Sequence, residues 1–302
     1  MALHGVLVLD KPAGMTSHDV VNRVRRKLGV RKVGHAGTLD PDATGVLVLC
    51  VGDATRLLEF AGADDKEYIG QAVFGRQTDT DDASGRTLLQ QDASLLRESE
   101  VVQTADAFLG VIEQRPPAYS AVHVQGKRAH ELARAGQSVE LPVRTIHIYS
   151  FEVLSFQPGP EAVSEFRAAC SKGTYIRSLC RDWGDMCGVP AHMGRLRRVR
   201  SGHFGLDEAV TLEQFENTLS PETMLQSPAA ALRGMPKVQV TQAQALRLAQ
   251  GQSIEREVDE PGIAAPLAAV FDAKRELIAV VEVQAGPKPI LKPKKVFWKR
   301  EP

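Results

Sequence analysis

The sequence of 302 residues predicts an α+β fold divided into two domains, residues 1–233 and 234–302. In the first part, short apolar or alternating strand patterns stand between amphipathic helices. Two longer strand patterns, at 144–156 and 162–169, follow one another across a Gln-Pro-Gly-Pro turn. Beyond residue 234 the pattern changes to short strands around one helix. Two domains also agree with a usual size of ~150 residues per domain.

The first strand and the first helix are marked by local signals. Residues 6–9 form a short apolar strand that ends in a loop containing proline and glycine. Thr16 and Asp19 have the spacing of a capping box, which starts a helix, and Gly29 is typical of a helix end. One face of this helix is apolar and the opposite face is strongly basic.

The stretch 34–47, GHAGTLDPDATGVL, combines three glycines with one imidazole, two hydroxyls and two carboxylates. Glycines let a backbone turn tightly and approach a ligand closely. The apolar run at 46–51 predicts a buried strand that anchors this loop. Asp40 is therefore a candidate nucleophile or general base. Asp-Pro-Asp is also a common turn sequence, so the stretch taken alone fits an ordinary turn equally well.

The later elements follow from periodicity and from glycine and proline positions. Alternation predicts the strand at 66–75, and successive prolines require an extended segment at 114–121. The full set for the first domain, besides the strands already given, is a short helix at 56–61, helices at 101–109 and 127–135, a helix beyond 176, a basic strand or turn at 195–200, and short helices at 211–217 and 221–225. The second domain has strands at 237–240, 264–271 and 277–283, and a helix at 242–250.

The composition is that of an ordinary globular protein, with 43% hydrophobic and 25% charged residues. Its four cysteines form no CxxC pair, which disfavours a structural zinc site and suits a reducing compartment. No apolar run reaches the ~18 residues of a membrane helix, and no leader pattern precedes the first strand. We therefore expect a cytoplasmic protein without membrane contact. No helix has an obvious second apolar face, from which we expect a monomer.

The formal net charge is zero, but the charges are segregated along the chain. Residues 165–205 contain eight basic and three acidic side chains, and residues 286–302 contain six and one. A third basic block lies at 23–32, while acidic residues gather at 64–65, 79–82 and 255–260. Segregated charge allows a basic face for nucleic acid on a neutral protein. Any single block also fits an ordinary solvated surface.

Several classes of chemistry lack their usual motifs. The sequence contains no P-loop, no dinucleotide-binding glycine motif, no HExxH and no GxSxG. The eight histidines are scattered, and none pairs with another at metal-ligand spacing. The aspartates of residues 77–85 suggest a calcium loop, but no acidic residue follows Gly85 at the required spacing. We expect no metal, no redox cofactor and no nucleotide cofactor.

Six segments resemble the TruB family of bacterial tRNA pseudouridine synthases, which isomerise a uridine at position 55, in the T loop of tRNA. These segments are GVLVLDKPAGMTS at 5–17, GHAGTLDPDATGVL at 34–47, KEY at 66–68, QRPPAYSAVHVQGKRAHELAR at 114–134, CSKGTYIRSL at 170–179 and LRR at 196–198. The resemblance covers residues 5–200 in order. It implies a catalytic domain built on a mixed, mainly antiparallel sheet flanked by helices. Beyond residue 234 the chain resembles the family's small PUA-like RNA-binding β domain in position and length.

The resemblance assigns the catalytic aspartate to Asp40, with attack on either the sugar or the base left open. Burial would raise the pKa of this carboxyl, so a cation is needed to keep it ionised, and the resemblance assigns that cation to Arg177. Asp42 is expected to be structural. Tyr68 and Tyr175 match the family's ring-stacking and proton-handling tyrosines, Tyr68 being the catalytic one.

A uridine inside a folded loop must be flipped out before it can react. His35 matches the imidazole that fills the gap left by this base, and Leu196 matches a residue that lines the pocket. Lys11 and Pro12 match substrate-site residues that support the catalytic loop from the first strand. The basic blocks at 23–32 and 195–200 and the basic C-terminal stretch are expected to contact tRNA phosphates.

Two positions depart from the family pattern: His123 replaces the usual Lys, and His130 replaces the usual Tyr. Both lie outside the catalytic loop and concern RNA contact. Two other functions remain alternatives, an RNA-binding or tRNA-folding module without catalysis and a guide-RNA-dependent (dyskerin-type) synthase. The absence of long Lys-rich tails disfavours the second.

Overall fold

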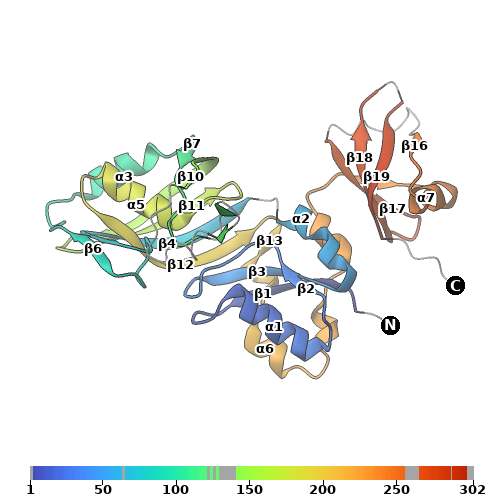
Figure 1. Cartoon of the computed structure of the whole chain (residues 1–302), viewed down its shortest axis with the longest axis horizontal. Helices are drawn as coiled ribbons and strands as arrows, with labels where there is room; N and C mark the ends of the chain where they lie inside the picture. Colours follow the sequence, from blue (N-terminus) through green and yellow to red (C-terminus); the bar gives the residue numbers. More distant parts are fainter. Residues whose placement is uncertain are drawn as a thin grey trace.

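The computed structural model describes residues 3–62, 65–120, 123–124, 127–128, 141–255, 265–286 and 288–297. Within these residues, ten strands form one mixed sheet that runs through the larger part of the molecule (Figure 1). Its main path is, in order, β14 (Val210–Thr211), β1 (Gly5–Lys11), β3 (Thr44–Val51), β12 (Ala191–Ser201), β4 (Lys66–Phe74), β11 (Ala162–Cys170), β10 (Arg144–Gln157) and β7 (Gly110–Gln114). β2 (Val33–His35) pairs with β3, and β13 (Phe204–Gly205) pairs with β12.

Most neighbouring strands in this sheet are antiparallel. The parallel pairs are β1 with β14 and β12 with β3. The predicted α+β class, with a mixed and mainly antiparallel sheet, is confirmed. The strand β12 lies between β3, in which the stretch 34–47 ends, and β4, which carries Tyr68. It therefore connects these two parts of the site.

The strands β1 and β3 are buried on both faces, which explains their uninterrupted apolar sequences. One face, with Leu7, Leu9, Leu47 and Leu49, belongs to the same core as helix α1 (Ser17–Leu28). The opposite face packs against the 3₁₀ helices η1 (Gly52–Leu57) and η4 (Pro228–Leu232) and helix α2 (Leu58–Ala61). The 34–47 loop is thus attached to a rigid strand.

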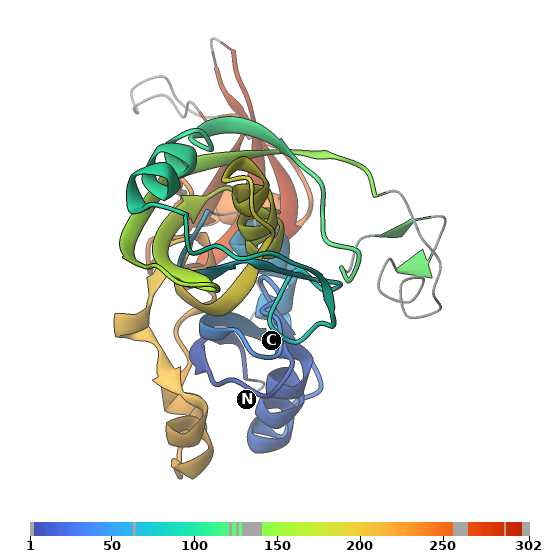
Figure 2. The same ribbon diagram turned by 90° about the vertical axis from the view of Figure 1, so that its left-hand side faces the viewer.

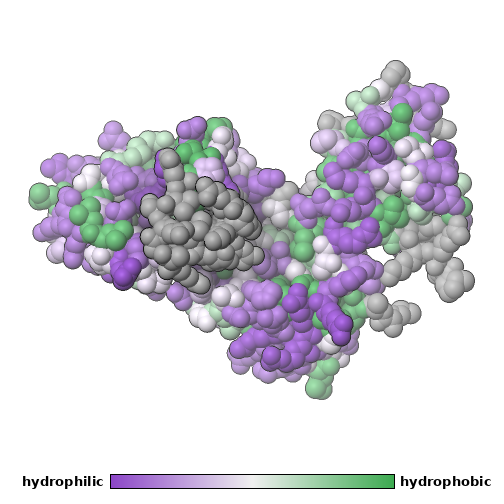
Figure 3. All heavy atoms as spheres, viewed as in Figure 1, coloured by the Kyte–Doolittle hydropathy of each residue, from purple (hydrophilic) through white to green (hydrophobic). Residues whose placement is uncertain are grey.

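Helix α1 has the predicted ends. Thr16 accepts from the Asp19 amide while the Asp19 carboxylate accepts from the Thr16 amide, and Gly29 adopts a left-handed φ of 66°. Val20, Val21 and Val24 are buried. Hydrophilic side chains gather over α1 on the surface shown in Figure 3.

Helices α3 (Glu98–Asp106) and α5 (Ile176–Met186) contact β10 and β4/β12 respectively, at the other end of the sheet (Figure 1). Trp183 of α5 is fully buried and makes edge-to-face contacts with Phe74, Phe151 and Phe166 of three strands. This aromatic cluster fixes α5 on the sheet. The first turn of α5, which carries Arg177, is positioned as a consequence.

A second sheet contains five strands in the described residues and curls beside η1 and α2 (Figure 1). Its order is β15 (Lys237–Gln239), β17 (Leu267–Phe271), β18 (Leu277–Gln284), β19 (Ile290–Val296) and β16 (Ile254–Glu255), and helix α7 (Gln242–Ala249) packs on it. Ala269 and Val280 also belong to the core cluster that contains Val6 and Val46. The small C-terminal β region is confirmed, and it is docked on the rest of the chain.

Other described elements are the hairpin of β5 (Arg76–Thr78) and β6 (Thr87–Gln90), the pair β8 (His123–Val124) and β9 (Lys127–Arg128), the 3₁₀ helices η2 (Leu206–Glu208) and η3 (Pro221–Met224), and helix α6 (Leu212–Asn217). Figure 2 shows the β8–β9 pair standing away from the main sheet. A helix was predicted at 127–135, but Lys127 and Arg128 form the strand β9. The rest of that predicted helix lies outside the described residues. The strands β7 and β19 were not predicted.

Candidate active site

The loop between β2 and β3 carries Asp40 and is held from three directions. Lys11 is fully buried, and its ammonium donates to the Pro41 carbonyl over 2.8 Å and to two carbonyls of the loop that follows β1. From α1, the Ser17 hydroxyl donates to the Leu39 carbonyl and accepts from the Leu39 amide. These contacts fix the backbone on both sides of Asp40. Pro12, the other predicted residue of this segment, is exposed.

The third set of contacts with this loop comes from Arg198 of β12. Its side chain is 1% exposed and donates to the carbonyls of Gly37, Thr38 and Val46. The guanidinium replaces solvent for backbone groups of the loop that would otherwise be buried without partners. The expectation that the block 195–200 contacts phosphates is therefore wrong for Arg198, because its donors are used inside the protein.

Two neighbours of Arg198 are also paired internally. Arg197 forms a salt bridge of 2.7 Å with Asp10, and Arg200 forms one of 3.0 Å with Glu67. In the block 23–32, Arg23 pairs with Glu216 over 3.2 Å, while Arg26 and Arg31 are exposed.

Arg177 and Asp40 come together from positions 137 residues apart. The Arg177 Nε lies 3.0 Å from one Asp40 carboxylate oxygen, and Nη2 lies 3.1 Å from the other. The remaining donors of Arg177 reach the carbonyls of Thr80 and Tyr119, at 3.2 and 3.1 Å. A two-point contact of this kind fixes both the orientation and the charge of a carboxylate.

The electrostatic surroundings distinguish Asp40 from Asp42. Burial raises the pKa of Asp40, Arg177 opposes this shift, and the nearby Asp82 carboxylate adds to it. About a third of the Asp40 side chain, 35%, remains accessible to a ligand. Asp42, by contrast, is exposed. The two carboxylates are alike in the sequence but occupy different environments.

Tyr68 points from β4 into the core side of the sheet and is 8% exposed. Burial raises the pKa of its phenol, and Arg198 opposes the shift. The Asp40 carboxylate adds to the rise in the pKa of this phenol. Leu196 is also 8% exposed and pairs with Gly70 on β4.

Tyr175 immediately precedes α5 and is half-buried. The Gln114 side chain bonds both its amide, over 2.8 Å, and its carbonyl, over 3.1 Å. His35 ends β2 and is also half-buried. Burial, with a contribution from Arg198, lowers the pKa of His35, so its imidazole is neutral at neutral pH.

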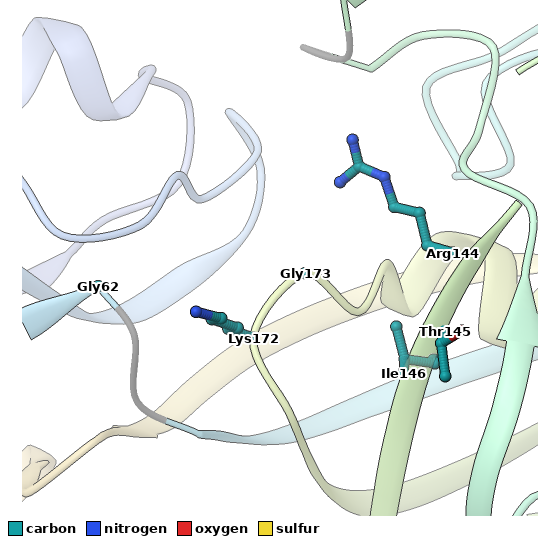
Figure 4. Close-up of a pocket in the computed structure, with 6 residues that line it drawn as sticks. All are labelled: Gly62, Arg144, Thr145, Ile146, Lys172 and Gly173. Carbon is teal, nitrogen blue, oxygen red and sulfur yellow. The ribbon is translucent and has the colours of Figure 1, made fainter. Parts of the chain in front are cut away.

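An open cavity of about 610 Å³ lies beside Tyr175. It is lined by Gly62, Arg144, Thr145, Ile146, Lys172 and Gly173. Figure 4 shows that the Arg144 and Lys172 side chains project into the same open space. The Arg144 guanidinium also lies 5.9 Å from the centre of the Tyr175 ring. The cavity is thus basic and adjoins a predicted site residue.

Two of the three glycines of the loop, Gly34 and Gly45, lie close to other parts of the protein. Gly45 has a φ of 103°, and a Cβ at this position would overlap the Arg198 carbonyl oxygen. A Cβ on Gly34 would lie 2.7 Å from Leu58. Both glycines permit close packing within the protein.

Several residues of this site were not predicted from the sequence. The aspartates at 79–82 suggest only a calcium loop in the sequence, whereas in the structure Asp82 lies 3.7 Å from Arg177 and Asp81 pairs with Arg181 over 2.7 Å. Gln114 was visible only as the start of the proline-rich segment. Among the described residues there is no cluster of His, Cys, Asp and Glu that could hold a metal ion. The side chains of His123 and His130 lie outside the described residues.

No helix in the described part of the chain is long and apolar enough to cross a membrane. Residues 25–176 match the family model for the N-terminal domain of TruB family pseudouridylate synthases. Residues 177–235 match the C-terminal domain model of tRNA pseudouridylate synthase B. Together these matches include the Asp40 loop and the helix α5.

Curated relatives and solved structures agree with these matches. The tRNA pseudouridine synthase B of Symbiobacterium thermophilum is 49% identical over 82% of this chain and 82% of that protein. The Bacillus cereus protein of the same name is 40% identical over 98% and 97%. A solved chain of an H/ACA ribonucleoprotein bound to a substrate RNA superimposes with a TM-score of 0.76 at 28% identity, covering 98% of this chain and 86% of that one.

Proposed function

The chain belongs to the TruB family of pseudouridylate synthases, and from this we infer that it is an enzyme that isomerises uridine to pseudouridine at position 55 of tRNA. The reaction breaks the bond between uracil N1 and ribose C1′, turns the base, and joins C5 to C1′. A proton leaves C5, and N1 gains one. Atoms are rearranged without net oxidation or phosphoryl transfer, so we propose that the enzyme needs no metal, redox cofactor or nucleotide.

The single observation that supports the chemistry best is the two-point contact between Arg177 and Asp40. Attack on the sugar and addition to the base both require an ionised carboxylate. Because burial raises the pKa of Asp40, the fixed guanidinium is what favours its charged form. We propose Asp40 as the nucleophile and Arg177 as the residue that keeps it ionised and oriented.

We propose that the flipped uracil stacks on Tyr68. A raised phenol pKa keeps this tyrosine neutral at neutral pH, which suits a ring that contacts a base and exchanges a proton late in the reaction. Tyr175, Leu196 and His35 complete the substrate site, with His35 filling the gap in the RNA stack. A neutral imidazole stacks without the cost of burying a charge.

The RNA backbone requires cations outside the catalytic centre. We propose that Arg144 and Lys172, which line the cavity beside Tyr175, contact phosphates near the flipped nucleotide. We propose that exposed basic side chains of α1 and β19 also contact phosphates. We further propose that residues 1–233 form the catalytic domain and 234–302 an RNA-binding domain, since the latter has its own sheet and apolar core. We also propose that the protein is a monomer, that it lies in the cytoplasm, and that its substrate is the T stem-loop of tRNA.

Asp40→Asn tests this function against an RNA-binding module without catalysis. Tritium release from a T-arm hairpin labelled at uracil C5 measures turnover. We expect no release by Asp40→Asn and RNA affinity within about tenfold of wild type, or ~1.4 kcal/mol. Asp42→Asn is the matched control and should retain turnover, because its carboxylate is exposed. Normal release by Asp40→Asn would refute the assignment, and a wild-type protein that binds the hairpin without release would favour the module.

A guide-RNA-dependent reaction is a second candidate that the same assay addresses. The fold similarity to a chain of an H/ACA ribonucleoprotein is consistent with either mode. The relatives at 40–49% identity are named tRNA pseudouridine synthase B, which supports recognition of tRNA itself. Turnover of the hairpin by purified protein without added guide RNA is the expected result.

A further inference from the structure

Two arginines one helical turn apart on α5 reach the same turn of the chain. Arg177 contacts the Thr80 carbonyl and the Asp82 carboxylate. Arg181 donates to the Asp81 carboxylate over 2.7 Å. Residues four apart on a helix project from the same face, so one face of α5 binds residues 80–82 twice.

The turn at 80–82 has a strained backbone. Asp81 has a φ of 59°, a left-handed value that is uncommon for residues with a Cβ although Asp and Asn adopt it more readily than most, and it is only 7% exposed. Such a conformation persists only where the surroundings hold it. The Arg181 side chain, together with the Met193 amide, which donates to the Asp81 carbonyl over 3.0 Å, provides this restraint.

The residues on each side of Asp81 are those that contact Arg177. Asp82 is further fixed by hydroxyl groups, with Thr80 at 2.7 Å and Ser84 at 2.5 Å from the same carboxylate oxygen. If Asp81 relaxed to an ordinary φ, the Thr80 carbonyl and the Asp82 carboxylate would both be redirected. Arg177 would then lose two of the acceptors that hold it against Asp40.

Arg181 has a second contact that matches one made by Arg177. Its Nη2 donates to the Arg115 carbonyl over 3.0 Å, while Nη2 of Arg177 donates to the Tyr119 carbonyl. Each arginine therefore joins the 80–82 turn to the extended segment 114–120. Arg181 is mostly buried, with 17% of its side chain exposed, so these contacts are formed away from bulk solvent.

We propose that Arg181 is a positioning residue for the isomerisation: through Asp81 it fixes the 80–82 turn, and that turn holds Arg177 in its two-point contact with Asp40. The proposal rests on the proposed function, because it assigns Arg181 to the same reaction. Arg181 acts on the rate of the chemical step through Arg177. Its donors are taken by Asp81, Asp182 and the Arg115 carbonyl, so we expect little direct effect on the affinity for RNA.

The test compares Arg181→Met, Asp81→Asn and the double variant with wild type. Asparagine tolerates the left-handed φ, so Asp81→Asn removes the charge without forcing the backbone to change. Arg181 also pairs with Asp182 over 2.8 Å, and this carboxylate, at 32% exposed, keeps access to solvent. The double variant removes both charges of the Arg181–Asp81 pair, and it decides the question if Arg181→Met fails to fold. Single-turnover tritium release, the Kd for the T-arm hairpin and Tm are measured for each protein.

We expect each single variant to lower the single-turnover rate about 10- to 100-fold, as small misplacements at a catalytic centre do, with the Kd within about threefold of wild type. Because the two residues act as one pair, the double variant should be no slower than the slower single variant. Arg181→Lys keeps the charge but loses the planar fork, and its rate should be intermediate.

Arg233→Met is the control for a loss of stability alone. It removes a salt bridge of 2.6 Å to Glu208 that has no contact with the site, so Tm should fall while the rate stays at the wild-type value. A folded double variant with the wild-type rate would overturn the proposal. The proposal would also be overturned if Arg233→Met lost as much rate for a given fall in Tm as the Arg181 and Asp81 variants. Wild-type protein without any turnover would instead refute the proposed function, and the proposal with it.

Discussion

Ser17 and Leu39 exchange two hydrogen bonds across 22 positions of sequence, with the hydroxyl donating over 3.0 Å and accepting over 2.8 Å. Ser17 is 2% exposed and is the first residue of α1. Leu39 directly precedes Asp40. The start of a capped helix therefore fixes the peptide group next to the proposed nucleophile, and this connection uses one small side chain.

Replacing Ser17 by Ala should destabilise both the protein and the geometry of its site. The change leaves the buried amide and carbonyl of Leu39 without these partners, which costs about 1–3 kcal/mol of unfolding free energy. Single-turnover pseudouridine formation should slow while RNA affinity is kept. Ser178→Ala is the matched control, since in the described structure this buried hydroxyl has no hydrogen-bond partner. Equal effects of the two substitutions on Tm and rate would contradict the prediction.

The elements that the sequence predicted are those with local signals. Helix α1 has its capping box and terminal glycine, and β1 and β3 have continuous apolar runs. The strands β7 and β19 lack such signals. β7 alternates with exposed residues directly after Leu109, and β19 contains three lysines and a proline with only Leu291 fully buried. Pairing with β10 and β18 decides their structure, and pairing is a tertiary property.

The sequence predicted the catalytic residues of the candidate site better than the residues that hold them in place. Motif resemblance placed Asp40 and Arg177 in one site, and the structure brings these two side chains into contact. The resemblance did not predict where other basic side chains lie or which groups they contact. Arg198 lies in a basic block and was expected at the RNA surface, but three carbonyls from the 37–46 region accept from it inside the protein. The charge of a side chain does not reveal which acceptors folding brings near it.

Gly45→Ala should be strongly destabilising. A Cβ at this position overlaps the Arg198 carbonyl oxygen on β12, and the φ of 103° is unfavourable for alanine. Overlap with a paired backbone cannot be relieved by a side-chain rotation, so we expect a loss of about 3 kcal/mol or more in denaturant unfolding. Gly14→Ala is the control. Its φ is also positive, at 81°, but no atom lies within 4 Å of the added Cβ, so the loss should be about 1–2 kcal/mol. Similar losses of stability at both positions would show that the positive φ, and not the overlap with Arg198, causes the destabilisation.

The acid limb of the rate–pH profile should report the surroundings of Asp40. Its carboxyl must be ionised to act, so activity is present above its pKa and is lost as the pH falls through it. Asp82→Asn removes a charge that raises the pKa of Asp40 and should move the acid limb to lower pH. Arg177→Met removes the cation that lowers this pKa and should move the limb to higher pH. It should also impair turnover more than binding. Single-turnover rates across pH measure both shifts, and shifts in the same direction would refute the electrostatic account.

Exposed lysines of the C-terminal sheet should contribute to the salt dependence of tRNA binding. Deleting the whole sheet is a poor test, because Ala269 and Val280 pack against the core of the main sheet.

Lys288 and Lys292 are exposed, and no acidic side chain of the described residues pairs with them, whereas Lys294 is paired with Glu282 over 3.1 Å. If Lys288 and Lys292 each neutralise a phosphate, replacing one by Gln should reduce the slope of log Kd against log salt by about 0.7–0.9. Lys294→Gln should change the slope less, because part of its charge is already compensated. Binding titrations at several salt concentrations check this. An unchanged slope in the Lys288→Gln/Lys292→Gln double variant would remove this part of the sheet from the tRNA interface.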